Sequence, residues 1–107
     1  MTSPPQKNSP TIPRAIPDTQ TLSDLSETFK ALAHPARLAI VHALAGSPVC
    51  ACELADIAQS TASTTSRHLT VLRHAGIIAN ERQGQQIFYR LTRPCVLQFM
   101  DCCVISK

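Results

Sequence analysis

From Thr21 onward, apolar residues recur at the three- and four-residue spacing of an α-helix. Four apolar residues follow this spacing: Leu22, Leu25, Phe29 and Leu32. The pattern predicts a first helix over residues 21–33. Thr21 and Asp24 have the spacing of a rough capping box, which places the helix start at Thr21.

A second helical stretch follows in "AHPARLAIVHALAG". Pro35 suits its first turn, where the missing N–H costs nothing, and Gly46 is expected to end it. Leu38, Val41 and Leu44 form its apolar stripe. After Ser47 and Pro48, "CELADIAQ" predicts a third helix of about two turns.

The next segments predict a longer helix, a hairpin and a last helix. Ser60 and Thr61 are candidate N-caps for "ASTTSRHLTVLRHAG", which Gly76 ends. "IIANERQGQQIFYRL" contains two β-prone runs around a polar turn at Gly84 and predicts a β-hairpin. "RPCVLQFMDCCVISK" is expected to form an amphipathic helix with Pro94 near its start.

This order predicts a mainly α fold of five helices with a β-hairpin wing. The third and fourth helices, joined by a short polar turn and followed by the hairpin, are typical of a winged helix-turn-helix. We expect this domain to occupy residues 19–107. Residues 1–18 contain five of the eight prolines and few apolar side chains, so we expect a disordered arm there.

On a helical wheel, the fourth helix has one apolar and one polar side. Placing Thr65, Leu69 and Leu72 inward turns a hydroxyl-rich face without carboxylates outward. Short hydroxyls permit close approach to DNA, and an arginine can pair with a guanine edge or a phosphate. The candidate DNA-contacting residues of this helix are Ser63, Thr64, Ser66, Arg67, Thr70 and His74.

The hairpin tip "ERQGQQ" adds Arg82, Gln83 and Gln85 as candidate contacts to the DNA backbone or minor groove. The charge distribution agrees with this assignment. Residues 60–93 carry five arginines and one acid, a net charge of +4, whereas the rest of the chain sums to −1. A polyanionic partner is therefore expected to meet this segment.

The sequence has no apolar run long enough for a membrane span and no secretion signal, so we expect a cytoplasmic protein without a membrane partner. Five cysteines are an odd number for a disulfide framework. In a reducing compartment they remain available for ligand or redox chemistry. His34, His42 and His68 are expected to have packing or capping roles.

Three segments together resemble the ArsR/SmtB family of winged-helix repressors, over about residues 22–104. They are "LAHPARLAIVHAL", "CELADIAQSTASTTSRHLTVLRHAGII" and "RQGQQIFYRL". The resemblance implies a homodimer, built by the first and last helices, that binds palindromic operator DNA. It also implies a repressor that releases the operator when a metal or metalloid binds.

The family's cysteine box is similar to "VCACEL" here, which implies that Cys50 and Cys52 are ligands. The family's arsenite sensors often have a third cysteine three residues after the second, where this chain has Ala55. Thr65 also departs from the usual apolar residue at its position. The family's zinc and nickel sensors place His and Asp ligands along the last helix. This chain has no histidine after His74, so a zinc site is not expected.

The expected inducer is As(III), with Sb(III), methylarsenite, Cd(II) and Pb(II) as alternatives, and no cofactor is expected. Thiolates select soft ions of this kind. Residues i and i+2 of a regular helix lie about 200° apart, so Cys50 and Cys52 converge only where the helix is unwound or has not begun. Ion binding there would reshape the start of the third helix, which supports the DNA-reading helix.

Trivalent arsenic is expected to prefer three sulfur atoms, and Cys102 or Cys103 is the candidate third donor. These two residues also form a possible site of their own. Cys95 shares their helical face but lies ~10.5 Å away along the axis, too far to share one ion on a straight helix.

Three other readings fit part of the sequence. The first is a repressor of the same fold with a redox or persulfide trigger that links Cys50 or Cys52 to Cys102 or Cys103. The second is a DNA-binding protein without a ligand. The third is a thiol-disulfide exchange enzyme, which is disfavoured because no C-x-x-C motif lies in a βαβ context. We therefore do not expect an enzyme.

Overall fold

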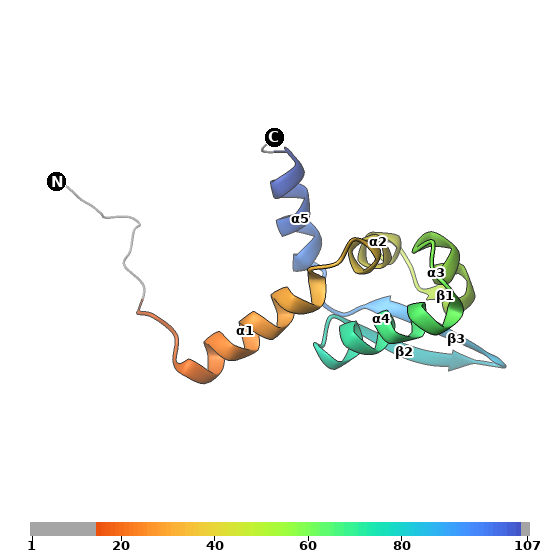
Figure 1. The fold of residues 1–107 in the computed structure, drawn as a ribbon, viewed down its shortest axis with the longest axis horizontal. Helices are drawn as coiled ribbons and strands as arrows, with labels where there is room; N and C mark the ends of the chain where they lie inside the picture. Colours follow the sequence, from red (N-terminus) through yellow and green to blue (C-terminus); the bar gives the residue numbers. More distant parts are fainter. Residues whose placement is uncertain (1–14, 106–107) are drawn as a thin grey trace.

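The computed structural model describes residues 15–105, which form five helices and a three-stranded antiparallel sheet. The elements, in chain order, are α1 (Thr19–Leu32), α2 (Pro35–Ala43), β1 (Val49–Cys50), α3 (Ala51–Ile57), α4 (Ala62–His74), β2 (Ile78–Gln83), β3 (Gln86–Leu91) and α5 (Cys95–Ile105) (Figure 1). The predicted winged helix-turn-helix with five helices is confirmed. None of the helices described has both the length and the apolar character that crossing a membrane requires. The predicted arm falls mostly on residues 1–14, which lie outside the described residues.

Helix α1 begins two residues earlier than predicted. Asp18, rather than Thr21, is its N-cap, and the Asp18 carboxylate accepts a 2.8 Å hydrogen bond from the Thr21 N–H. A carboxylate outcompetes a hydroxyl here because it places negative charge at the positive end of the helix. The predicted capping box of Thr21 and Asp24 is therefore wrong, and Asp24 instead accepts a hydrogen bond from Gln20.

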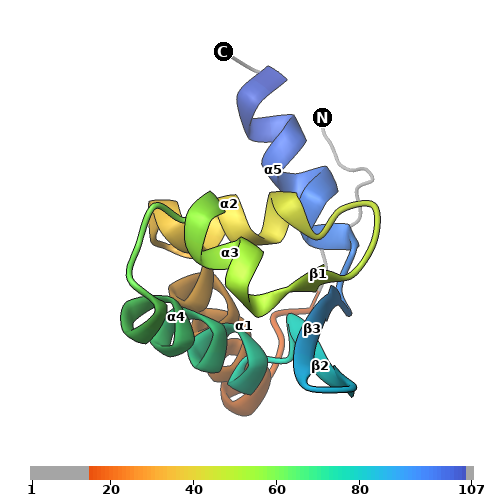
Figure 2. The same cartoon turned by 90° about the vertical axis from the view of Figure 1, so that its right-hand side faces the viewer.

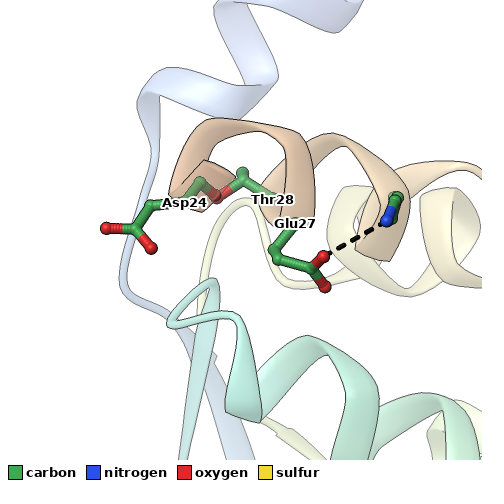
Figure 3. A network of polar contacts seen from close by, with 4 residues as sticks. Asp24, Glu27 and Thr28 are labelled. Carbon is green, nitrogen blue, oxygen red and sulfur yellow. Dashed lines mark hydrogen bonds and ion pairs between the residues drawn. The ribbon is translucent and has the colours of Figure 1, made fainter. Parts of the chain in front are cut away.

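One side of α1 carries polar side chains (Figure 3). Nζ of Lys30 lies 3.2 Å from Oε2 of Glu27, and the Thr28 hydroxyl donates to the Asp24 carbonyl at 3.2 Å. The exposed Glu27–Lys30 pair is expected to contribute little to stability.

Helix α2 starts as predicted and ends early. His34 is its N-cap, with Nδ1 accepting a 3.1 Å hydrogen bond from the Ala36 N–H, and Pro35 occupies the first helical position. The helix ends at Ala43, three residues before Gly46. The left-handed glycines are Gly76 and Gly84, so Gly46 does not provide the predicted stop.

The sheet contains a strand that the sequence pattern did not indicate. Val49 and Cys50 pair with Tyr89 and Phe88 of β3, which gives the strand order β1-β3-β2. The predicted hairpin is therefore two strands of a three-stranded sheet. As a result, the residues just before α3 are hydrogen-bonded to the wing.

Helix α4 has the predicted ends. Thr61 is the N-cap, and its hydroxyl accepts a 3.0 Å hydrogen bond from the Thr64 N–H. Gly76, with φ +77°, follows the helix, and the Ile77 N–H returns to the Leu72 carbonyl at 3.1 Å. This Schellman-type ending requires a left-handed residue, which glycine supplies without strain.

The core lies where α2, α3 and α4 meet the sheet. The side chains of Ile40, Leu54, Leu72 and Ile77 are fully buried there. Leu54 of α3 therefore packs in the same core as Leu72 of α4, which fixes the two helices of the helix-turn-helix against each other. Figure 2 shows α4 and the hairpin along the lower side of the molecule, with α2 and α5 above them.

Helices α1 and α5 project from this body and expose apolar side chains (Figure 1). The exposed apolar residues on them are Leu22, Leu25, Phe29, Phe99 and Val104. Phe29 and Phe99 stack edge to face with ring centroids 5.7 Å apart. We call these five residues the α1/α5 apolar surface. Exposed apolar side chains that gather on neighbouring elements mark interaction surfaces in many proteins.

Candidate functional site

The buried side of α4 matches the predicted wheel and adds one residue. Thr65, Leu69 and Leu72 are all buried, and so is His68. His68 was not assigned to this stripe, although it lies three residues after Thr65 and four before Leu72, a spacing that places it on the same face. The buried face orients the opposite side of α4 toward solvent.

The solvent-facing side of α4 presents most of the predicted DNA contacts. Ser63, Thr64, Ser66, Arg67 and His74 are exposed. Thr70 is half-buried, and its hydroxyl donates a 2.9 Å hydrogen bond to the Ser66 carbonyl. The Thr70 side chain is therefore less available for a contact to DNA than the side chains of the other five residues.

The wing presents the remaining predicted contacts. Arg82, Gln83 and Gln85 are exposed around the turn at Gly84. Glu81 lies 3.6 Å from Nε of Arg90 on the adjacent strand. That pair offsets the negative charge of this segment.

Positive charge remains available on both the helix and the wing. Within residues 15–105, neither Arg67 nor Arg82 forms an ion pair. Helix α4 and the wing therefore each present a guanidinium that has no ion pair within the described residues and can attract a polyanion.

The two cysteine sulfur atoms of the third-helix segment are adjacent. Cys50 ends β1 and is the N-cap of α3, with the extended backbone angles φ −66° and ψ 143°. Cys52 lies in the first turn. Their Sγ atoms are 2.8 Å apart and share a hydrogen bond in which either thiol is the donor. The two sulfur atoms can meet because Cys50 precedes the helix. Within a regular helix, residues i and i+2 would point in nearly opposite directions.

The shared hydrogen bond makes the two thiols unequal. Donation from the Cys52 thiol stabilises a Cys50 thiolate and lowers the pKa of Cys50. The same bond raises the pKa of Cys52, with burial adding to the effect. Cys50 is buried and Cys52 is exposed, so the more acidic sulfur is the less accessible one. Thiolate is the form that binds soft metals and attacks electrophiles.

The C-terminal cysteines lie on α5 and are exposed. Cys103 lines an apolar cavity of about 390 Å³ together with Phe29, His42 and Phe99. Cys50 and Cys52 instead line a cavity beside Gln85 and Ile87 of the wing.

The described part of the chain holds no cluster of three His, Cys, Asp or Glu side chains suited to a metal ion. Within one chain, the structure thus does not bring Cys102 or Cys103 to the Cys50–Cys52 pair as a third donor. It provides a two-thiol site at the start of α3 and separate thiols on α5.

Packing or capping roles were expected for three histidines, and the structure shows such roles for His34 and His68. His34 caps α2, and its ring centroid lies 4.5 Å from that of buried His68. Nη1 of Arg37 lies 3.4 Å from Nδ1 of His68. Burial, followed by the charges of His34, Arg37 and Arg67, lowers the pKa of His68. His42 is exposed and lines the cavity beside Cys103.

Comparisons with known proteins agree with this geometry. Residues 34–80 match the family described as "Bacterial regulatory protein, arsR family". The transcriptional repressor SmtB of Mycobacterium tuberculosis is 40% identical over 82 residues, which cover 77% of this chain and 60% of that protein. This chain therefore spans less than two thirds of the length of SmtB. The cadmium resistance regulatory protein CadC of Listeria innocua is 33% identical over 84 residues, covering 78% and 71%.

A solved structure shows the same fold. The homodimeric winged helix-turn-helix DNA-binding domain from Mycobacterium bovis superposes with a TM-score of 0.72 at 24% identity, covering 81% of each chain. The relatives named here are transcriptional regulators, which agrees with the expectation that this chain is not an enzyme.

Proposed function

This chain belongs to the ArsR family of bacterial regulatory proteins, and we propose that it is a homodimeric transcriptional repressor that leaves its operator when a thiophilic ion binds to Cys50 and Cys52. The observation that carries this proposal is the 2.8 Å distance between the two sulfur atoms at the junction of β1 and α3. Two adjacent thiols are the ligands that a soft ion selects.

The ion changes DNA binding through α3. Coordination replaces the thiol hydrogen bond by two bonds to one atom and so repositions the first turn of α3. Leu54 of that helix packs in the same core as Leu69 and Leu72 of α4, so the displacement reaches the reading helix. Converting a mostly bound population to a mostly free one requires a difference of about 5.5 kcal/mol between the two states, which new bonds to sulfur can supply.

The operator contacts come from α4 and the wing. Arg67 is the candidate for a bidentate contact to guanine, and Ser63, Thr64 and Ser66 permit close approach to the groove. Arg82, Gln83 and Gln85 extend the contact to the backbone or minor groove. In a twofold dimer, two α4 helices enter successive major grooves about 34 Å apart.

The α1/α5 apolar surface is the proposed dimer interface. A monomer would leave Phe29 and Phe99 each 52% exposed. The homodimer reported for the Mycobacterium bovis domain supports this assignment.

Arsenite is the proposed inducer, in a role in arsenical resistance, with Sb(III), methylarsenite, Cd(II) and Pb(II) as alternatives. CadC, a cadmium resistance regulator, supports a thiophilic ion in general. Cys102 and Cys103 are the proposed second set of thiol ligands, or the source of a third donor from the partner chain in the dimer.

A second candidate function is a redox-sensing repressor of the same fold. The lowered pKa of Cys50 favours a thiolate that a peroxide can oxidise. In that case peroxide would oxidise one thiol of Cys50 or Cys52 and one of Cys102 or Cys103 to a disulfide, with water as the product, and the second thiol would come from the partner chain of the dimer. A persulfide trigger would need a sulfane-sulfur compound as the co-reactant.

A gel-shift titration tests both candidates. The wild-type protein on operator DNA in reducing buffer is titrated with arsenite, antimonite, Cd(II), Pb(II) and hydrogen peroxide. We expect arsenite to release the DNA from the wild type and the Cys95→Ser control but not from the Cys50→Ser/Cys52→Ser variant. Release by peroxide alone would favour the redox function. An unchanged ion response in the double variant would move the site to Cys102 and Cys103, which the Cys102→Ser/Cys103→Ser variant then tests.

A further inference from the structure

The buried histidine of α4 contacts an arginine of α2. His68 is only 8% exposed and lies on the inward face of α4. Nη1 of Arg37 lies 3.4 Å from Nδ1 of His68. A guanidinium has donors and no acceptor, so Nδ1 of His68 must be an unprotonated nitrogen that accepts this hydrogen bond. The contact between α2 and α4 therefore requires a neutral His68 ring.

Arg37 has few other partners. Within residues 15–105 it forms no ion pair. Its Nη2 donates to the Lys30 carbonyl at 3.5 Å, and its Nε is buried without a hydrogen-bond partner among the described residues. A buried charge is costly unless it is paired or hydrogen-bonded. The neutral ring of His68 is thus the side-chain acceptor that the structure gives this guanidinium.

A second histidine at this junction is also used as an acceptor. The ring centroid of His34 lies 4.5 Å from that of His68. Nδ1 of His34 accepts the hydrogen bond from the Ala36 N–H that caps α2, so this nitrogen is unprotonated as well. Helices α2 and α4 therefore meet through two rings that each present a lone pair to a donor of α2.

The groups around His68 oppose a proton on its ring. Burial disfavours the charged ring most strongly, and His34, Arg37 and Arg67 add positive charge, so the pKa of His68 is lowered. The carboxylates of the elements packed against α4 do not offset this charge. Those of α1 and β2 are engaged by cations, in the Glu27–Lys30 and Glu81–Arg90 pairs, and those of α3, on Glu53 and Asp56, are exposed.

We infer that Arg37 and His68 are positioning residues that hold α4 in its DNA-binding place, and that a proton taken up by Nδ1 of His68 breaks their contact and releases the operator. The added proton makes two donors and two positive charges face each other. The inference rests on the proposed function, because it assumes that α4 reads the operator. It makes the repressor sensitive to acid as well as to its ion.

The surroundings of Arg37 leave the guanidinium a place to go. Arg37 lines a cavity of about 430 Å³ between α1, α2 and α4, together with Glu27, Lys30 and His74. A guanidinium repelled by a charged His68 can turn into this cavity toward the Glu27 carboxylate. Helix α4 then loses its side-chain hydrogen bond to α2, while the apolar core remains.

Operator affinity as a function of pH tests the inference. The full chain is titrated by fluorescence anisotropy onto a duplex selected from a random library at pH 7.5 and onto an unrelated duplex, and circular dichroism monitors folding at each pH. We expect the ratio of the two affinities to be constant above about 6.5. Below that value it should fall by at most about tenfold per pH unit, because one proton is linked to binding. The unrelated duplex corrects for exposed His74, whose charging strengthens binding to any DNA.

Variants separate His68 from the other histidines. His68→Gln keeps an uncharged acceptor for Arg37 at every pH, so it should bind the selected duplex at pH 7.5 and lose the pH dependence. Arg37→Gln removes the charge that opposes the proton. It should weaken operator binding about tenfold at pH 7.5 and flatten the profile. His34→Asn keeps an N-cap that does not titrate, and His42→Gln changes an exposed histidine of α2. Both should keep most of the wild-type profile.

Several results would overturn the inference. One is a constant ratio down to pH 5.5 in the folded wild type, and another is an equal fall in His68→Gln. Loss of the folded circular dichroism signal together with operator binding would also overturn it, since His68 would then act on stability alone. If His68→Gln does not fold, an unflattened profile in Arg37→Gln overturns it. All these results leave the ion-responsive repressor intact, whereas failure to enrich any duplex at pH 7.5 would overturn both proposals.

Discussion

The hydroxyl of Thr92 donates a 2.8 Å hydrogen bond to the carbonyl oxygen of Gly76. Nε of Arg93 donates to the same oxygen at 3.2 Å, and the Thr92 N–H bonds to the Ile77 carbonyl at 2.9 Å. The turn that follows α4 is therefore fastened to the short segment between β3 and α5. This connection links the proposed dimer helix with the proposed DNA-binding helix.

Removing the Thr92 hydroxyl is expected to loosen that connection. Thr92→Val should lower the free energy of unfolding by about 1 kcal/mol and weaken operator binding, as measured by urea denaturation and gel shift. Thr28→Val is the control, since its hydroxyl bonds to a carbonyl of its own helix and its loss should change stability by less than about 0.5 kcal/mol. Equal effects of the two substitutions would contradict a special role for Thr92.

Thr65→Val is expected to stabilise the protein. Valine has nearly the same shape as threonine and removes a buried hydroxyl without a hydrogen-bond partner. The free energy of unfolding should rise by about 1–2 kcal/mol, measured by thermal or urea unfolding. A loss of stability would mean that a water molecule satisfies this hydroxyl.

Acid is expected to destabilise the fold through His68. Because the pKa of His68 is lowered in the folded state, the unfolded chain binds this proton more readily, and the folded state favours the neutral ring. The contribution is fully present above the ordinary value of about 6.5 and is lost as the pH falls through the lowered pKa. Unfolding free energies between pH 7.5 and 5 should fall less steeply in His68→Gln than in the wild type or in His42→Gln. Parallel slopes in all three proteins would exclude His68 as the source.

Replacing Arg67 and replacing Arg82 are expected to change operator binding in different ways. Arg67→Ala should cost about 1–3 kcal/mol of operator affinity and relax the base preference at one position. Arg82→Ala should weaken binding to all sequences and reduce the salt slope by about 1. Lys30→Ala, which removes a positive charge on α1 that Glu27 already offsets, is the control, and fluorescence anisotropy over a salt series is the measurement. A salt slope unchanged in Arg82→Ala would exclude a phosphate contact.

The α1/α5 apolar surface predicts the behaviour of Phe99→Glu. A carboxylate at this position opposes burial against a second chain, so the variant should sediment as a monomer and bind operator weakly. Gln98→Glu adds the same charge at a neighbouring exposed position and should remain a dimer. A dimeric Phe99→Glu protein would place the interface elsewhere.

The sequence predicted the elements whose signals are local. Thr61 and Gly76 define the ends of α4 through a side-chain cap and a left-handed residue, and both act within a few residues of the chain. The apolar spacing of α4 likewise placed Thr65, Leu69 and Leu72 inward. Such features depend little on distant parts of the fold.

Features that depend on distant partners were missed. Val49 and Cys50 form a strand only because β3 lies beside them, and two residues carry no periodic signal. The Asp18 cap is an exception, because its contact to Thr21 is local and was missed only because Asp18 follows a proline-rich stretch that was assigned to the arm. A cavity of about 230 Å³ beside Cys52 is lined by alanines of α3 and α4 and by Tyr89 of β3, which no spacing in the sequence brings together.

The two-residue strand β1 has a mechanical consequence. Cys50 is at once a proposed ligand, the N-cap residue of α3 and the register partner of Phe88 in the wing. A displacement of this residue would reach both α4 and the wing, the two elements of one subunit that are proposed to contact DNA. Both sets of DNA contacts should therefore weaken in a single step. Complexes in which only one set has been released should contribute little to the response.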